Sequence, residues 1–475
     1  MDGPAASYRV GPPVWHQITF AERLLSAETA DRVRQRTEAL AAEGIDVVRV
    51  TYPDMMGSDR SRDILLHHLP HAVGHGLAFS RAVYHTGALG DHSHIAGGLE
   101  AGMPDILVRP DLTTLVPLPW EPGVAECIGD VRDPATGLPV PESPRDLLRQ
   151  VIGLLIDGDL TAVVGPELEY VLLDPDPASP VGWRRYAPAP GHVYTTGRKG
   201  DPDGHLLRTV RALHALGLDV SGGNREYDSG QFEINLSHCE ALDAADRAFR
   251  FKAAIKELAH AEGRLATFMA KPLNDGGGSG FHLHLSLVDA DGRNVFDAPR
   301  DAYGLSVTAR HALAGVLAHA PALSALLNPT VNSYKRFGPD TTAPWLINWG
   351  LDNRNALVRV PPERGGATRL EARLGDATAN PYLAIAGLLA AAHLGIAAAE
   401  EPPAPMTGQG HDRGTAAALP TGLGQALDAL EADHQLTDVL GKPFVDAFLT
   451  FKRDELARFQ RYVTDWEFRE YARII

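Results

Sequence analysis

Residues 163–171 read Val163-Val164-Gly165-Pro166-Glu167-Leu168-Glu169-Tyr170-Val171, and this stretch decides the architecture that we expect. Its β-branched and aromatic residues predict a strand, on which side chains two positions apart share a face. Glu167 and Glu169 therefore lie side by side, while Leu168 and Tyr170 point to the other face. Two neighbouring negative charges are unfavourable unless a cation lies between them. A solvated strand face would be the simpler interpretation if this pair stood alone.

Two segments further along the chain carry similar chemistry. The stretch Asn224-Arg225-Glu226-Tyr227-Asp228-Ser229-Gly230-Gln231-Phe232-Glu233-Ile234-Asn235 places two more glutamates on either side of a glycine turn. The stretch Gly276-Gly277-Gly278-Ser279-Gly280-Phe281-His282-Leu283-His284-Leu285-Ser286-Leu287 is a glycine-rich loop that leads into a strand, with both histidines on one face. Such a loop can hold phosphate through backbone N–H groups, although glycine-rich loops are common.

Arginines gather in the next part of the chain. Arg369-Leu370-Glu371-Ala372-Arg373-Leu374 puts two guanidinium groups and one carboxylate on a single strand face, and Arg354 and Arg359 lie just upstream. A planar guanidinium binds carboxylates and phosphates through two parallel hydrogen bonds. Internal salt bridges are the alternative for any one arginine, but they are disfavoured for all four because buried ion pairs contribute little net stability.

Composition excludes several classes of function. The chain has 475 residues, 44 Lys+Arg against 60 Asp+Glu, a formal charge of −16 and 44% hydrophobic residues, as expected of a soluble globular protein. It has no basic run, so nucleic acid is not an expected partner. Two cysteines and the lack of a signal-peptide pattern at the N-terminus predict the cytoplasm. The apolar run from Tyr382 to Ala399 contains His393 and is interpreted as a buried helix, so no membrane is expected.

The predicted fold class is α+β, with a small domain over residues 1–119 and a larger domain over residues 120–475. A helix over residues 15–40 and a strand over residues 45–51 begin the small domain, for which we expect an open sheet. The proline-rich junction at residues 117–122 marks the boundary. The larger domain is predicted to start with a capped helix over residues 144–156 and a strand over residues 161–173.

In this order the segments resemble the glutamine synthetase family, and the resemblance covers nearly the whole chain. The matching segments are Gly165 to Glu169, Glu226 to Glu233, Lys271 to Ser286, Asn328 to Arg336, Asn353 to Pro361 and Arg369 to Leu389. The resemblance implies a small N-terminal β-grasp domain and a large C-terminal catalytic α/β domain. It also implies a homo-oligomeric ring, a dodecamer of two hexamers, with each active site between neighbouring subunits.

The resemblance further implies two divalent ions, ATP and glutamate in each active site. Glu169, Glu226 and Glu233 match the ligands of one ion, and Glu167, His282 and Glu371 match those of the other. Five carboxylates with one imidazole suit Mg²⁺ or Mn²⁺, and the absence of thiolates argues against zinc. By the same resemblance, the residues expected to bind ATP or substrate are Gly278, His284, Ser286, Arg336, Arg354, Arg359, Arg369 and Arg373. Of these, Arg354, Arg359 and Arg373 are also expected to act in catalysis.

The implied reaction has two steps: ATP phosphorylates the γ-carboxylate of glutamate, and an amine then displaces phosphate. Family members that use ammonia hold the ammonium ion with two acidic residues, one in a Phe-Asp-Gly-Ser-Ser block and one in a Gly-Tyr-Glu-Ala-Pro loop. The present chain has Ser80 and Thr342 at these positions, and Asp340 could substitute only if its loop shifts by two residues. Each lost charge-assisted hydrogen bond is worth about 1.5 to 3 kcal/mol. We therefore expect a larger primary amine, such as a polyamine, ethanolamine or another alkylamine.

Two alternatives to this glutamate–amine ligase stay open. One is a glutamine synthetase that uses ammonia through a rebuilt ammonium site. The other is a non-catalytic structural relative, which is disfavoured because such a chain would have no reason to keep all six metal ligands. Two smaller departures from the family are Gly277, where ammonia-using members carry an Asn that touches glutamate, and residues 403–419, which lack the Tyr that is adenylylated in some bacterial members.

Overall fold

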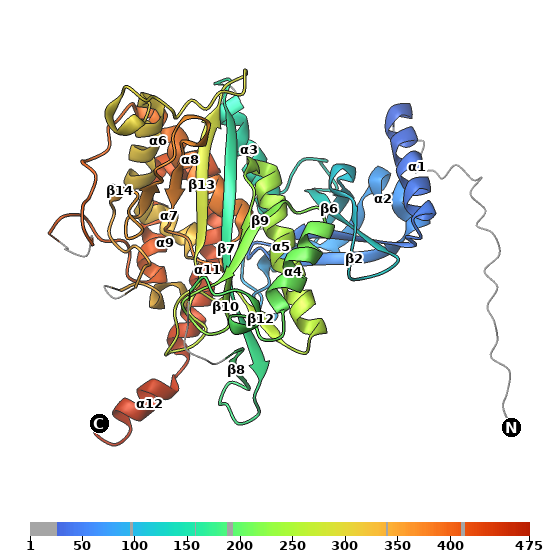
Figure 1. Cartoon of the computed structure of the whole chain (residues 1–475). Coiled ribbons are helices and arrows are strands. Elements are labelled where there is room, and N and C mark those ends of the chain that lie inside the picture. The colour runs from blue at the N-terminus through green and yellow to red at the C-terminus, as the bar shows by residue number, and fades with distance from the viewer. Residues whose placement is uncertain (1–25, 96–97, 157, 188–192, 339–340, 410–413) are drawn as a thin grey trace.

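The computed structural model describes residues 26–475 except 96–97, 157, 188–192, 339–340 and 410–413. The protein combines α-helices with two β-sheets, as the predicted fold class requires. The N-terminal elements form a unit beside the larger, helix-covered sheet that contains the long strand β7 (Figure 1).

The smaller sheet has the strand order β2-β1-β6-β4-β3, with β5 paired to β6. Its strands are β1 (Val47–Pro53), β2 (Asp59–Leu65), β3 (Leu77–Ser80), β4 (Asp105–Pro110), β5 (Val116–Pro117) and β6 (Val124–Arg132), and its helices are α1 (Ala27–Ala42) and α2 (Leu69–His75). The first part of the helix predicted over residues 15–40 lies outside the described residues. Ser26 caps the start of helix α1, and its hydroxyl accepts a hydrogen bond from the Thr29 amide.

Strand β6 lies beyond the domain boundary that was predicted between residues 119 and 120. It runs parallel to β1 and antiparallel to β4, in the middle of the smaller sheet. The connectivity of this sheet therefore continues to Arg132, because a central strand cannot be separated from its two neighbours. The proline-rich junction at residues 117–122 is a connection within the sheet, and the boundary itself stays a prediction.

The larger sheet has ten strands in the order β14-β15-β16-β13-β7-β10-β9, and β8, β11 and β12 also pair with β7. The strands are β7 (Thr161–Pro175), β8 (Trp183–Arg185), β9 (Val220–Arg225), β10 (Gln231–Leu236), β11 (Cys239–Glu240), β12 (Leu265–Thr267), β13 (Phe281–Val288), β14 (Trp349–Leu351), β15 (Val358–Val360) and β16 (Leu370–Ala372). The strand predicted over residues 161–173 is confirmed as β7, which is 15 residues long and pairs with five other strands.

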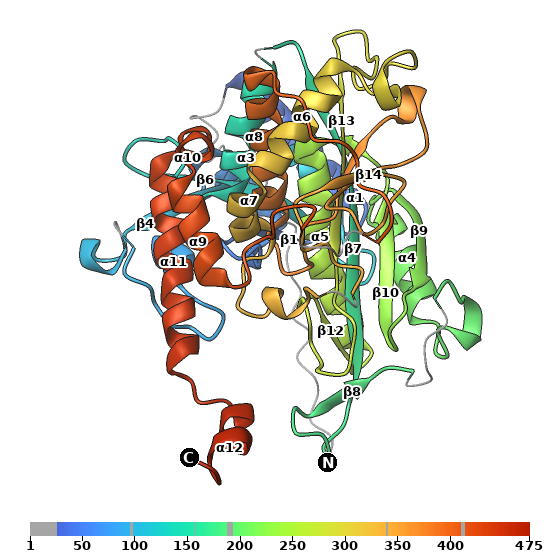
Figure 2. The same ribbon diagram turned by 90° about the vertical axis from the view of Figure 1, so that its left-hand side faces the viewer.

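Helices pack around the larger sheet and extend past it. They are α3 (Pro144–Ile156), α4 (His205–Ala215), α5 (Ala241–Ala261), α6 (Val307–Ala318), α7 (Ala320–Leu327), α8 (Pro381–Ala398), α9 (Leu423–Ala432), α10 (His434–Leu440), α11 (Lys442–Arg461) and α12 (Asp465–Tyr471). Helices α9, α10 and α11 gather at one side, and α12 projects away from the body of the protein (Figure 2). The predicted helix over residues 144–156 is confirmed as α3.

Helix α8 is the one helix of the described residues that is long and apolar enough to cross a membrane. Its apolar window is 72% buried inside the protein, and it packs against α3, α5, α6 and α7. Asn380 caps its first turn by accepting a hydrogen bond from the Tyr382 amide, and Pro381 occupies the first helical position. The prediction of a buried helix is therefore confirmed.

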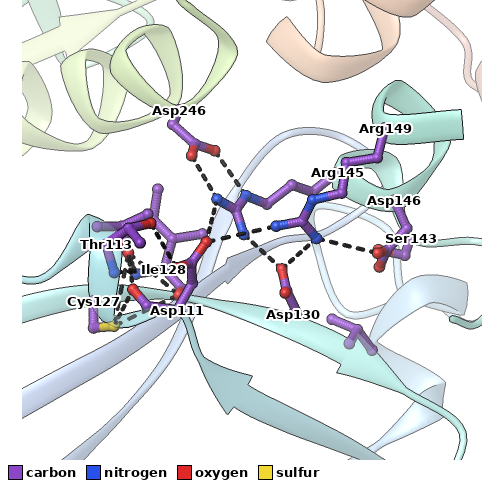
Figure 3. Close-up of polar contacts among 12 residues, drawn as sticks. Asp111, Thr113, Cys127, Ile128, Asp130, Ser143, Arg145, Asp146, Arg149 and Asp246 are labelled. Carbon is purple, nitrogen blue, oxygen red and sulfur yellow. Dashed lines mark hydrogen bonds and ion pairs between the residues drawn. The ribbon is translucent and has the colours of Figure 1, made fainter. Parts of the chain in front are cut away.

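An ion network joins the smaller sheet to the helices of the larger unit (Figure 3). Arg145 on α3 donates to both carboxylate oxygens of Asp246 on α5 at 2.9 and 2.7 Å. The same guanidinium reaches Asp130 on β6 at 2.5 Å and Asp111 at 3.0 Å. Because its side chain is only 3% exposed, Arg145 fixes the two units through interactions that water does not screen.

Candidate active site

The register of four strands assembles the predicted metal-binding residues. Glu169 on β7 is opposite Glu233 on β10, and Glu167 on β7 is opposite His282 on β13. On the other side of β13, His284 is opposite Glu371 on β16. These side chains come from segments up to 204 positions apart in the sequence (371 − 167), yet strand pairing makes them neighbours. Glu226, which directly follows β9, accepts a hydrogen bond from Asn224.

Burial and neighbouring carboxylates oppose the ionisation of three of the acidic residues. Among the described residues, no ion pair joins Glu169, Glu226 or Glu233 to a Lys or Arg. Burial, followed by the charges of neighbouring carboxylates, raises the pKa of Glu233 to about 8. Burial also raises the pKa of Glu169 to about 7, with Glu226 adding to the shift. A buried group of mutually repelling carboxylates is the environment that a hard divalent cation stabilises.

A second cluster surrounds Glu167. One ligand atom each of Glu167, His284 and Glu371 lie within 4.8 Å of one another. His284 Nε2 is 2.9 Å from Glu167 Oε1, and His282 Nδ1 is 3.5 Å from Glu167 Oε2. Burial alone would raise the pKa of Glu167, but the two imidazoles outweigh it and hold that pKa well below its usual range. The structure thus brings both histidines to Glu167, whereas the sequence resemblance placed only His282 among the metal ligands.

Hydrogen bonding distinguishes the two histidines. Arg369 Nε donates to His284 Nδ1 at 3.1 Å, so a neutral His284 carries its proton on Nε2 and can donate it to an oxygen anion. Burial and the charge of Arg373 lower the pKa of His282 to about 4, which keeps that ring neutral, as a metal ligand must be. These states favour His282 as a metal ligand and His284 as a donor to phosphate oxygens.

Glu371 is held by two of the predicted substrate-binding arginines. Arg359 and Arg373 each donate to one of its carboxylate oxygens at 2.5 Å, and the residue is 1% exposed. Burial opposes ionisation of Glu371, but Arg373 and the nearby imidazoles lower its pKa to about 2. Arg359 also binds Asp352. The internal salt bridges that were considered for single arginines therefore exist for this pair.

Two buried arginines have an N–H group without a hydrogen-bond partner among the described residues. Arg336 donates to the carbonyl oxygens of Leu374 and Gly375, but its Nε has no partner among the described residues. Arg373 Nε is likewise unpaired. Burying an unpaired donor costs about 1–3 kcal/mol, so both positions favour an incoming anion. The other arginines are more accessible, since Arg354 is exposed and Arg369 is partly exposed with Glu363 as its ion-pair partner.

The glycine-rich loop packs tightly against these groups. A Cβ atom on Gly278 would lie 2.4 Å from Arg336 Cγ, and one on Gly280 would lie 2.8 Å from His282 Nε2. The Gly280 amide donates to Glu169 Oε2 at 2.9 Å. Ser286 is partly buried on β13 and shares the strand face of the two histidines. Glycine is therefore required here by the close approach of the loop to the site.

Sequence comparison identifies the family. The family model described as the glutamine synthetase catalytic domain matches residues 141–471. This chain belongs to the glutamine synthetase family. The match begins after β6, the last strand of the smaller sheet.

Several relatives within the glutamine synthetase family align with almost the whole chain. The glutamine synthetase of Methanocaldococcus jannaschii is 37% identical over 455 residues, covering 92% of this chain and 98% of the relative. The glutamine synthetase of Halobacterium salinarum is 34% identical over 457 residues, covering 94% of this chain and 98% of the relative. Among solved structures, GmaS without ligand superimposes with a TM-score of 0.81 at 33% identity, covering 92% of this chain and 99% of that one. A structure described as a novel glutamine synthase homologue has a TM-score of 0.78 at 29% identity, covering 91% and 99%.

The sequence analysis missed three polar residues that hold the glutamates of this glutamine synthetase-type site. Gln231 donates to Glu169 at 2.7 Å and to the Gly278 carbonyl at 3.0 Å. Asn224 and Asn235 donate to Glu226 and Glu233. A weak signal was present, because Gln231 and Asn235 lie two positions before and after Glu233 and therefore share its strand face.

Proposed function

We propose that this glutamine synthetase family enzyme is an ATP-dependent ligase that joins glutamate to a primary amine through a γ-glutamyl phosphate intermediate. Enzymes of the family use ATP, glutamate and either ammonia or an amine. The observation that carries the proposal is the combination of a complete acidic and arginine-lined site with Ser80 and Thr342 at the positions where ammonia-using members have carboxylates. The site supports phosphorylation of glutamate, and the two replacements favour a larger amine.

The residues present fit a pair of hard divalent cations. Glu169, Glu226 and Glu233 would hold one ion, and Glu167, His282 and Glu371 would hold the other. The raised pKa values of Glu169 and Glu233 in the first group and the neutral imidazole in the second support this assignment, because a bound cation would favour the ionised carboxylates. When bound, Mg²⁺ or Mn²⁺ supplies charge neutralisation for the transferring phosphoryl group.

The chain's own residues then bind and orient the substrates. The unpaired N–H groups of Arg336 and Arg373 would donate hydrogen bonds to oxygens of the glutamate carboxylate and of the transferred phosphoryl group. His284, fixed by Arg369, would donate its Nε2 proton to a phosphate oxygen. Arg354 and Arg359, which are expected to act in catalysis, would stabilise the negative charge on the phosphate groups. The amine nitrogen attacks the γ-carbonyl carbon, the bond from that carbon to the phosphate oxygen breaks, and the released phosphate takes up the proton that the nitrogen loses.

The amine preference rests on the chemistry of two side chains. Ser80 lies at the end of β3 and its hydroxyl accepts a hydrogen bond from the Ala82 amide, while Thr342 is exposed. Neither offers a charge to a small cation. Asp340, the possible substitute, lies outside the described residues. A short hydroxyl side chain also leaves room for carbon atoms on the nitrogen, and each buried CH₂ group contributes about 0.8 kcal/mol. The structural likeness to GmaS, a γ-glutamylmethylamide synthetase, supports an alkylamine acceptor.

Ammonia-dependent glutamine synthesis is the second candidate, because curated relatives that cover almost the whole chain are named glutamine synthetase. An assay of phosphate release distinguishes the amine ligase from the ammonia-dependent enzyme. It contains ATP, glutamate and one acceptor at a time, which is ammonium, methylamine, ethanolamine or putrescine, and mass spectrometry identifies the product. We expect kcat/KM to be about tenfold higher or more for at least one larger amine, a difference of about 1.4 kcal/mol. Thr342→Glu should narrow the difference. Glutamine as the sole product would refute the amine ligase.

We also propose that the protein assembles into a homo-oligomeric ring. The support is the C-terminal segment, where Trp466, Phe468, Tyr471, Ile474 and Ile475 are exposed on or beyond the projecting helix α12 (Figure 2). Contiguous exposed apolar side chains are typical of surfaces that bind another protein. Light scattering of the full chain and of a chain ending at residue 461 tests this, and a monomeric full chain would refute it.

A further inference from the structure

A cavity of about 740 Å³ lies away from the acidic site, between the turn that joins β1 to β2 and helices α5 and α11. Its volume is in the range of small-molecule sites. Much of its wall is apolar, including Met55, Phe268, Phe448 and Phe451. None of the residues predicted to bind metal, ATP or glutamate lines it.

Two lysines on one face of α5 give this cavity its charge. Lys252 and Lys256 are one helical turn apart, and their Nζ atoms lie 5.4 and 5.9 Å from the centre of the Phe268 ring. Within the part of the chain that the structure describes, no ion pair joins either lysine to a carboxylate. Burial, followed by the charge of Lys256, lowers the pKa of Lys252 to about 7. An anion between them would relieve this repulsion.

The other cations of the cavity wall are already paired. Arg264 binds Asp174, Asp203 and Glu262, and Arg458 binds Asp91 and Asp454. Lys452 binds Glu455 at 2.8 Å. Among the described residues, the Lys and Arg side chains of the cavity wall that form no ion pair are therefore Lys252 and Lys256, in a protein whose formal net charge is −16.

The buried position of Lys252 leaves one donor for a ligand. Lys252 is 6% exposed, and its Nζ donates to the carbonyl oxygens of Ala377 and Ala379 at 2.9 and 3.0 Å. An ammonium group has three N–H donors, and these two carbonyls use two of them. We propose that the cavity binds a small organic anion, with its carboxylate or phosphate group between Lys252 and Lys256 and its apolar part against the phenylalanine rings.

The segment that Lys252 holds continues directly to the candidate active site. The Leu374 and Gly375 carbonyls accept hydrogen bonds from Arg336, and the Ala377 amide donates to the Ser279 carbonyl in the glycine-rich loop. An anion that binds Lys252 therefore acts on a segment whose other side positions Arg336. An effect on ligation would rest on the proposed function, whereas binding in the cavity does not.

Calorimetric titration of the full chain, saturated with glutamate so that the active site is occupied, tests the proposal. The probes are benzoate and phenylphosphonate, which separate carboxylate from phosphate-type recognition, with benzamide as the neutral match for benzoate. At least one anion should bind about tenfold more tightly than benzamide, as expected for the loss of a charge-assisted hydrogen bond.

Lys252→Met should weaken anion binding by about tenfold or more. Lys256 is exposed, so Lys256→Gln should fold normally and should also weaken binding, whereas Arg373→Lys in the active site should not. The anion should also slow hydrogen exchange of the amides of residues 376–380. The proposal would be overturned if neither anion binds, if benzamide binds as tightly as benzoate, or if anion binding survives both lysine replacements. A cavity filled by a neighbouring subunit would appear as a lack of anion binding and would overturn the proposal as well.

Discussion

Replacing Glu233 by Gln should stabilise the metal-free protein and weaken its binding of metal. Glu233 is directly opposite Glu169 across β10 and β7, and like charges in that position are destabilising. Glutamine has nearly the same shape and can still accept the hydrogen bond from Asn235. The change therefore removes one negative charge from the acidic group while keeping its packing.

The magnitude follows from the pKa of Glu233, which is raised from an ordinary value of 4.5 to about 8 by burial and by neighbouring carboxylates. A tenfold change in proton affinity corresponds to about 1.4 kcal/mol, so the charge costs about 3 kcal/mol at pH 7. Burying the glutamine amide also has a cost, and we therefore expect Glu233→Gln to raise the free energy of unfolding of the metal-free protein by about 1–2 kcal/mol.

The gain should depend on pH in a defined direction. Because the folded protein holds the Glu233 proton more tightly than the unfolded chain does, the penalty is absent below about pH 4.5. It grows as the pH rises and is complete above about pH 8. The wild-type protein without metal should therefore lose stability over this range relative to Glu233→Gln.

Urea unfolding in EDTA at pH 5 and pH 8, at one protein concentration, measures this difference. Glu38→Gln on the exposed face of α1 is the matched control and should change nothing. Addition of Mg²⁺ or Mn²⁺ should raise the unfolding midpoint of the wild type more than that of Glu233→Gln. The reasoning is refuted if Glu233→Gln is less stable than the wild type at pH 8 in EDTA, or if metal stabilises both equally.

Three further predictions concern arginines of the site and of the domain junction. Arg145→Met should destabilise the protein by about 3–5 kcal/mol, because it leaves the carboxylate of Asp246 buried without its cation. The side chain of Arg149 is 30% exposed, so Arg149→Met should cost under about 1 kcal/mol. Equal midpoints of urea unfolding for the two variants would contradict this prediction. Arg373→Lys should lower kcat/KM by an amount that corresponds to a loss of more than about 1 kcal/mol of transition-state stabilisation, because an ammonium group cannot both hold Glu371 and bind substrate as a planar guanidinium does. Phosphate release at the wild-type rate would exclude Arg373 from the groups that contact the reacting atoms. Gly278→Ala should raise the KM for glutamate about tenfold by pushing Arg336 aside, and an unchanged KM would mean that Arg336 does not bind glutamate.

The sequence alone determines which side chains of the acidic strand β7 share a face. The alternation of Glu167, Leu168, Glu169 and Tyr170 determines which side chains share a face, because side chains alternate along any strand. The structure agrees, since Leu168 and Tyr170 are fully buried. The order of the motifs along the chain was likewise enough to indicate the glutamine synthetase family, which the family model at residues 141–471 supports independently.

Pairing between strands was beyond the reach of the sequence. The two-residue period of a strand says nothing about which strand lies beside it, so β6 could not be placed between β1 and β4. The same limit applies to Arg359, because only the pairing of β15 with β16 places it opposite Glu371.

Side-chain environment was decided only by the tertiary structure. The sequence contains both His282 and His284 on one face, but their different states depend on Arg369 and on burial beside Arg373. In the same way, Lys252 is one of many charged residues in a helical segment until α5 packs against residues 377–379 and closes a cavity over it. The desolvation of these side chains and the partners of Arg369 and Lys252 come from groups distant in the chain, and local residue patterns therefore do not reveal them.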